Sequence, residues 1–278
     1  MPADVSYQHD TPQGPRTVTV HYERRGSGTP LLLLHGIGHH WQAWAPVLDA
    51  LAEEHEVFAV DLPGFGASAP LPEGSAYDLA SVVPGLGGLC TALGIERPHV
   101  AGNSLGGLLA LEMGRRGLAR SVTALSPAGF WNRPEQAYAF GLLLYMRLGA
   151  KTLPAPAVRR LAERPATRGV LVGSIYARPG LRGAAEAVAE TRALRDAAGF
   201  APTLRAGLNV NVTEDVAEVP VTIGWGTKDR LLLPRQADRA RLRMPGARVV
   251  PLPGCGHVPM NDDPQLVARI LLDGSKDV

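Results

Sequence analysis

The chain has 278 residues, of which 45% are hydrophobic and 19% charged, so it can bury a sizeable core and is neither disordered nor of low complexity. This length predicts one large domain, or one domain that carries an insertion. The net charge of +2 gives no electrostatic reason to expect a nucleic acid as partner. The cysteines and histidines show no zinc-ligand spacing.

Nothing in the sequence indicates a membrane protein or a secreted one. The first ten residues lack the basic segment and apolar run of a secretory signal. No apolar stretch approaches the roughly 20 residues that a membrane span needs. Cys90 and Cys255 do not make a disulfide framework and fit a reducing compartment. We therefore expect a cytoplasmic protein without a membrane span.

The first half of the chain alternates between two patterns. An alternating segment at residues 16–25 predicts an early antiparallel edge strand. Short apolar runs bounded by glycine or proline then predict buried parallel strands at 31–34, 57–60, 99–101 and 122–125. Helical stretches separate these runs, at 41–54, 79–93 and 105–116. The alternation predicts βαβ units, and therefore an α/β fold with a mostly parallel twisted sheet flanked by helices.

The middle of the chain, residues 130–212, breaks this rhythm. It has no clear buried strand, and prolines punctuate several helical stretches, which predicts an all-helical insertion. Its twelve basic and five acidic residues give a net charge of +7. This charge could attract an anionic substrate or a membrane surface, but a solvated arginine-rich face is more common.

The strand–helix alternation resumes after the insertion. We expect a strand at 221–225, a helix at 235–243, a strand at 248–252 and a helix at 264–272. The chain is therefore predicted to have two parts. Residues 1–129 and 213–278 form the α/β core, and residues 130–212 form the helical part inserted into it.

One pentapeptide has the form of a nucleophile-bearing turn. Gly102-Asn103-Ser104-Leu105-Gly106 lies between a predicted strand and a predicted helix, where such a turn places a serine hydroxyl at the top of the sheet. The flanking glycines remove side chains that would collide with neighbouring backbone. The alternative is a glycine-rich turn whose serine only caps the helix. We expect Ser104 to be a nucleophile.

A serine nucleophile needs a base and a group that orients the base. His257 follows the last predicted strand, in a loop of small residues that can turn inward. Asp229 follows the strand at 221–225, although an aspartate in such a turn is common for structural reasons alone. All three residues come just after predicted strands. Along the chain the serine comes first, the aspartate second and the histidine last, which is the order of the triad in one known fold of serine hydrolases. We expect them to form a catalytic triad.

A further glycine-rich loop, His35-Gly36-Ile37-Gly38, follows the strand at 31–34. It would bring the backbone N–H of Ile37 beside that of Leu105, and two such donors stabilise an oxyanion. A phosphate-binding loop is the weaker interpretation, because neither G-x-G-x-x-G nor a Walker lysine is present.

These motifs resemble those of a serine-dependent member of the α/β-hydrolase superfamily, in its esterase or carbon–carbon bond hydrolase branch. The resemblance extends from about residue 17 to 270 and includes the pieces His35-Gly36, residues 61–68, residues 102–107, residues 226–229 and Gly256-His257. It implies that the helical insertion is a lid after the sixth strand. It also implies that Ile37 and Leu105 supply the oxyanion hole and that residues 61–66 form a structural corner.

The resemblance implies a hydrolase without a cofactor or metal that cleaves an ester-type bond of a small, largely apolar substrate through an acyl-enzyme. We expect Trp41, Trp131, Phe140 and Val258 to contact the substrate. The alternatives are a carbon–carbon bond hydrolase of ring-cleavage products and a non-catalytic binding protein. The first commonly has an aromatic residue where Val258 stands, and its dianionic substrate would need a lid arginine such as Arg133, Arg147 or Arg192.

Overall fold

The computed structural model describes residues 2–216 and 218–276. One eight-stranded sheet forms its centre, in the order β1-β2-β4-β3-β5-β6-β7-β8. The strands are β1 (Pro2–His9), β2 (Arg16–Arg25), β3 (Thr29–Leu34), β4 (His55–Val60), β5 (His99–Asn103), β6 (Ser121–Leu125), β7 (Val221–Gly226) and β8 (Arg248–Leu252). β2 pairs antiparallel with β1 and β4, and every other pair is parallel. The predicted fold class, a mostly parallel sheet, is confirmed.

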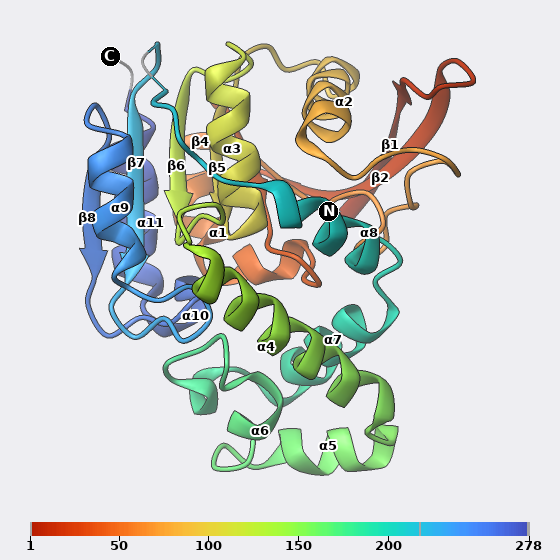
Figure 1. Ribbon diagram of the computed structural model, residues 1–278, viewed down its shortest axis with the longest axis vertical. Helices are drawn as coiled ribbons and strands as arrows, with labels where there is room; N and C mark the ends of the chain where they lie inside the picture. The colour runs from red at the N-terminus through yellow and green to blue at the C-terminus, as the bar shows by residue number, and fades with distance from the viewer. Residues whose placement is uncertain (1, 217, 277–278) are drawn as a thin grey trace.

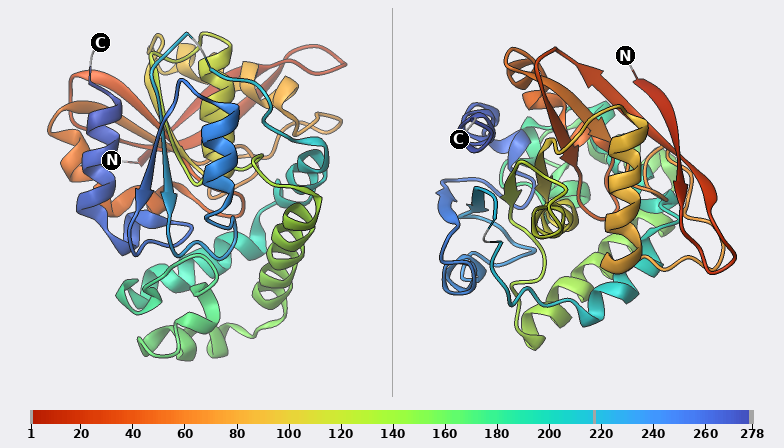
Figure 2. Two further views of the ribbon diagram at one scale, coloured as in Figure 1. Left: turned by 60° about the vertical axis from the view of Figure 1, so that its left-hand side comes forward. Right: turned by 90° about the horizontal axis from the view of Figure 1, so that it is seen from above.

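Helices cover both faces of this sheet (Figures 1 and 2). The core helices are α1 (Ala45–Ala52), α2 (Leu79–Ala92), α3 (Leu105–Arg115), α9 (Gln236–Arg243), α10 (Pro259–Asp262) and α11 (Pro264–Gly274). Apolar side chains of α2, α3 and α9 belong to one buried cluster, and those of α1 and α11 belong to another. The sheet therefore separates two hydrophobic cores.

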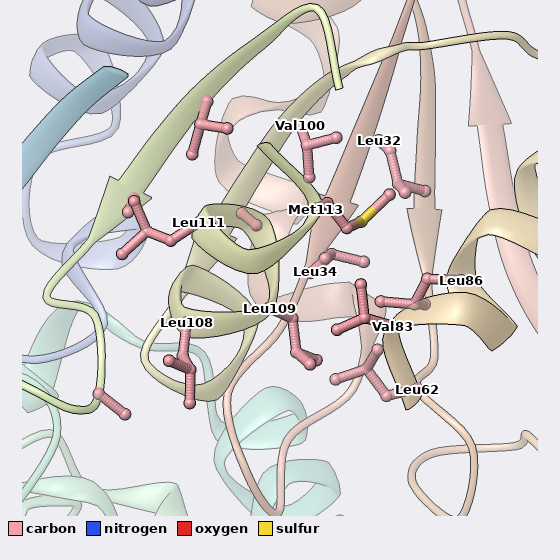
Figure 3. Close-up of a cluster of buried hydrophobic side chains, with 14 of the residues drawn as sticks. Leu32, Leu34, Leu62, Val83, Leu86, Val100, Leu108, Leu109, Leu111 and Met113 are labelled. Atoms are coloured by element: carbon pink, nitrogen blue, oxygen red, sulfur yellow. The ribbon is translucent and has the colours of Figure 1, made fainter. Parts of the chain in front are cut away.

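The strand β3 shows why its apolar run is continuous. Leu32 and Leu34 lie in the core that α2 and α3 cover, whereas Leu31 and Leu33 lie in the core of α1 and α11. Successive side chains of a strand point to opposite faces, so a strand that is covered on both sides must be apolar at every position. Figure 3 shows part of the first of these cores, to which Leu32 and Leu34 of β3, Leu86 of α2 and Leu109 of α3 all contribute.

A helical segment separates β6 from β7. It contains α4 (Arg133–Thr152), α5 (Ala155–Glu163), α6 (Gly169–Val172), α7 (Ala184–Asp196) and α8 (Phe200–Ala206), with short 3₁₀ turns at Pro179–Leu181 and Gly207–Asn209. A further 3₁₀ turn, Trp41–Trp44, belongs to the core and precedes α1. The arrowheads of β6 and β8 in Figure 1 mark the carboxyl ends of these strands, and helices α4–α7 lie beyond those ends. We refer to residues 130–212 as the helical insertion.

Two expectations about the sheet and its first helix need correction. The strand at residues 16–25 is not at the edge, because β1 pairs with it along its length. Most side chains of β1 are exposed, so this strand has almost no apolar pattern to reveal it. The single helix expected at 41–54 is a 3₁₀ turn followed by α1. Pro46 lies in the first turn of α1, where a missing N–H costs no hydrogen bond.

In the described part of the chain, no helix combines the length and the apolar character needed to span a membrane.

Candidate functional site

Ser104 stands on a strained turn between β5 and α3. Its φ of 57° and ψ of −113° lie outside the regions that residues with a side chain ordinarily adopt. The turn depends on its glycines: a Cβ on Gly102 would lie 2.0 Å from the carbonyl oxygen of Gly106, and a Cβ on Gly106 would lie 2.0 Å from that of Leu34. Packing therefore holds the serine in this conformation despite its backbone strain.

The side chain of Ser104 is not a helix cap. Ser104 occupies the N-cap position of α3, but its hydroxyl makes no capping hydrogen bond. Ser104 is 6% exposed, and it lines a cavity between the sheet and the helical insertion. The alternative that the sequence left open, a serine that only caps its helix, is therefore not what the geometry favours.

His257 and Asp229 form a buried hydrogen-bonded pair. Nδ1 of His257 lies 2.8 Å from Oδ2 of Asp229, and because a carboxylate only accepts, Nδ1 carries the proton of this bond. The other carboxylate oxygen accepts the backbone N–H groups of Leu231 and Leu232, at 2.9 and 2.8 Å. Nε2 of His257 is buried without a hydrogen-bond partner in the described structure. His257 lines the same cavity as Ser104, with Nε2 free to accept a proton.

Two residues that the sequence analysis gave no role hold the His257 loop. The side-chain amide of Asn103 donates to the carbonyl oxygens of His257, at 2.8 Å, and Leu125, at 3.0 Å. Asp262 accepts from the N–H of Gly256 at 2.8 Å and from that of Ala177, in the helical insertion, at 2.9 Å. Asn103 thus ties the loop to the serine turn, and Asp262 ties it to the insertion.

The loop after β3 packs directly against the serine turn. A Cβ on Gly36 would lie 3.2 Å from Cβ of Ser104, and Gly38 has a φ of 74°. The N–H of Leu105 is at the first position of α3, where no intrahelical acceptor exists. The N–H of Ile37 donates to no backbone carbonyl of the described residues. Both groups are thus available as donors beside Ser104.

The side chain of His35 is a neutral imidazole that holds this loop in place through two hydrogen bonds. Nε2 accepts the N–H of Leu62 at 3.0 Å, so the proton is on Nδ1, which lies 2.7 Å from the carbonyl oxygen of Gly36. The side chain is completely buried, and this burial lowers the pKa of His35 to about 4, against a weaker opposing effect of Asp61. Protonation would remove the acceptor at Nε2 and place a charge in the core.

We expect this histidine to make the protein less stable in mild acid. Between the ordinary pKa of 6.5 and the folded value of about 4, only the unfolded chain takes up a proton at His35, which costs about 3 kcal/mol of unfolding free energy as the pH falls through that window. Denaturant unfolding of the wild type and of His35→Gln at about pH 7 and about pH 4 measures the effect. The wild type should lose about 3 kcal/mol more than the variant, and equal losses would contradict the buried neutral state.

The corner at residues 61–66 is structural, as the resemblance implies. The carboxylate of Asp61 accepts the N–H groups of Trp41, at 2.6 Å, and Ala67, at 2.8 Å. A Cβ on Gly66 would lie 2.1 Å from this carboxylate. Both oxygens of Asp61 thus help to shape the corner, and Asp61 is not among the residues that line the cavity of Ser104.

The cavity beside Ser104 has a volume of about 380 Å³ and is largely apolar. The helical insertion supplies much of its wall, including Leu143, Met146, Leu171 and Leu194, and the core supplies Ile37 and Val258. Among its described lining residues, Glu190 is the only one with a carboxylate, and none is a lysine or arginine. A second, smaller apolar cavity of about 50 Å³ also touches Ser104.

The residues expected to contact the substrate lie in three places. Val258 lines the larger cavity, and Trp131 and Phe140 line the smaller one. Trp41 lines neither; instead it is buried in the core that α1 and α11 cover. Its position just after the loop at residues 35–38 suggested a pocket residue, but the 3₁₀ turn directs this side chain into the core.

None of the three candidate lid arginines reaches the cavity of Ser104. Arg147 donates to the carbonyl oxygens of Leu194 and Ala197, and its guanidinium lies 4.5 Å from the centre of the Phe200 ring. Arg133 is exposed at the start of α4, and Arg192 lines a different depression. The insertion therefore offers no cation to a substrate bound beside the serine in this structure.

The sequence matches a known protein family and several individual proteins over most of its length. The sequence profile of a family described as "Alpha/beta hydrolase family" matches residues 31–270. A pimeloyl-[acyl-carrier protein] methyl ester esterase of Aeromonas hydrophila is 31% identical over 263 residues, which are 91% of this chain and 98% of that protein. An uncharacterized protein of Mycobacterium tuberculosis is 32% identical over 266 residues, 88% of this chain and 76% of its own.

The fold also matches solved structures. A thermophilic esterase from Thermogutta terrifontis superposes with a TM-score of 0.75 at 20% identity, over 98% of this chain and 97% of the esterase. At this identity the match shows the shared fold.

Proposed function

The chain belongs to the α/β-hydrolase family, and from this premise we propose that it is a serine hydrolase that cleaves an ester bond in a small, largely apolar substrate. The observation that carries the proposal is the convergence of Ser104 and His257 on one cavity, with Asp229 bound to the far nitrogen of the imidazole. A methyl ester esterase among the relatives at 31% identity supports ester hydrolysis.

The proposed reaction has two halves. Nε2 of His257 accepts the proton of Ser104 as the serine oxygen attacks the ester carbonyl, and the N–H groups of Ile37 and Leu105 donate to the oxyanion. This attack gives a tetrahedral intermediate. The intermediate collapses to an acyl-enzyme while His257 returns the proton to the leaving alcohol. Water then attacks the acyl-enzyme with His257 again as base, which releases the acid and restores Ser104.

The chemistry of the cavity supports an uncharged substrate. A ring-cleavage dienoate brings two negative charges, which need cationic partners when they leave water. The described lining of the cavity has no lysine or arginine, and Arg147 is committed to backbone carbonyls of the insertion. An ester needs only the oxyanion donors and a proton for its leaving group, which these residues can supply.

Comparing two substrates tests this choice. We expect a higher kcat/KM for a short-chain p-nitrophenyl ester than for a 2-hydroxy-6-oxo-dienoate, because the cavity offers no charge to the second. Both rates are measured on one preparation. A dienoate preference of about tenfold, or about 1.4 kcal/mol of transition-state stabilisation, would contradict the proposal. Turnover of neither, in protein that also fails to react with a fluorophosphonate, would favour a non-catalytic binding protein.

A further inference from the structure

The insertion places one buried carboxylate in the wall of the apolar cavity. Glu190 of α7 is 4% exposed and lines the same cavity as Ser104 and His257. Its Oε1 accepts two hydrogen bonds, from the hydroxyl of Tyr176 at 2.8 Å and from Nε of Arg182 at 2.7 Å. Its Oε2 is buried without a partner in the described structure. One oxygen of this side chain therefore accepts two hydrogen bonds, and the other, also buried, accepts none among the described residues.

The charge around Glu190 is already balanced. Arg182 is as buried as Glu190, and the two form an ion pair with no net charge. Burial raises the pKa of Glu190 and Arg182 opposes the shift, while burial holds the pKa of the adjacent His39 well below its ordinary value and keeps that ring neutral. A cation brought to Oε2 would itself be buried next to Arg182, whereas a neutral hydrogen-bond donor would add no charge.

An ion pair alone does not account for this arrangement. Arg182 and Tyr176 use only Oε1, so a purely structural role leaves Oε2 desolvated at a cost. A ligand group that donates to Oε2 removes this cost, and a ligand without a donor leaves it in place. Sites built around such a polar atom discriminate strongly between ligands that differ in one hydroxyl or N–H.

We propose that Oε2 of Glu190 is a specificity subsite that accepts a hydrogen bond from a neutral donor of the substrate, a hydroxyl or an amide N–H, carried on the chain that fills the cavity. This inference rests on the proposed ester hydrolysis and specifies its substrate: an ester whose apolar chain ends in, or carries, one uncharged donor group. Thr191, the next residue on α7, also lines the cavity but donates its own hydroxyl proton to the carbonyl of Ala187.

A set of three esters tests the proposal on the wild-type protein. The three esters share one chain and differ only at its end. A methyl end offers no polar group, a hydroxyl end offers a donor that can also accept, and a methyl ketone end offers an acceptor only. The set is made twice, with the variable end on the acyl side and on the alcohol side, over a series of chain lengths. In one of the two sets, kcat/KM for the hydroxyl ester should exceed both others by about tenfold, or about 1.4 kcal/mol.

The variant Glu190→Gln should remove the discrimination against the ketone ester, while the hydroxyl ester, whose oxygen can also accept, keeps a partner. Arg182 and Tyr176 are donors, so they hold the amide oxygen and turn the NH₂ group to the position of Oε2. The ketone ester should then gain at least tenfold relative to the methyl ester. Glu190→Leu should remove the differences among all three esters. Glu186→Gln, the same change on the exposed face of α7, should keep the wild-type pattern.

Each rate is divided by the concentration of sites titrated with a fluorophosphonate, so that misfolded variant protein does not count. Ester turnover with equal rates for the methyl and hydroxyl esters at every chain length would overturn the subsite and leave the proposed function intact. The same holds if the ketone ester gains nothing over the methyl ester in Glu190→Gln. Absence of ester turnover together with absence of fluorophosphonate labelling would instead overturn the proposed function.

Discussion

Ser104→Ala should lose activity toward an ester by roughly 10⁴- to 10⁶-fold, because the remaining members of a triad contribute little without the nucleophile. The strained backbone at residue 104 is held by the packing of Gly102 and Gly106, so alanine can occupy the turn without its collapse. In the wild type, a fluorophosphonate should add its mass to the peptide that contains Ser104. Mass spectrometry of the digested protein locates the label.

Ser81→Ala serves as the matched control, because Ser81 lies at the start of α2, its hydroxyl contacts His9, and neither residue lines the cavity. This variant should keep both activity and label. A label on any residue other than Ser104, or an active Ser104→Ala protein, would remove the serine mechanism from consideration. Circular dichroism of both variants should match that of the wild type, which controls for misfolding.

The fold was predictable because its central strands are buried on both faces. A run such as Leu31–Leu34 is apolar at every position, and the helices that cover it have clear patterns of their own. β1 lies at the edge of the sheet with most side chains exposed, so it has little pattern to detect. The helical insertion could be recognised from the sequence because it lacks buried strands. The sequence could not show which of its side chains face the cavity.

The residues of the candidate site that directly follow strands could be predicted from the sequence. Ser104, Asp229 and His257 each come after a strand of one parallel sheet, and parallel strands bring their ends to one edge. The roles of Asn103 and Asp262 depend on tertiary contacts that no local pattern encodes. Asp262 and Asp263 are adjacent and chemically identical, yet one anchors the His257 loop and the other caps α11.

The second large effect concerns the tautomer of His257. In Asp229→Asn, the backbone N–H groups of Leu231 and Leu232 still need an acceptor and will hold the amide oxygen. The NH₂ group then faces Nδ1 of His257, which must become the acceptor, so the ring proton moves to Nε2. An imidazole protonated at Nε2 cannot take the proton of Ser104.

We therefore expect Asp229→Asn to lower kcat by roughly 10³- to 10⁴-fold while KM stays close to that of the wild type, because the substitution changes the base and not the cavity. Asp238→Asn, an exposed aspartate of α9, provides the same chemical change without this effect. Full activity of Asp229→Asn would require another carboxylate to orient His257. Glu135, the first acidic residue after β6, is buried against Arg235 and Arg239 and caps α4, so it has no oxygen free for that role.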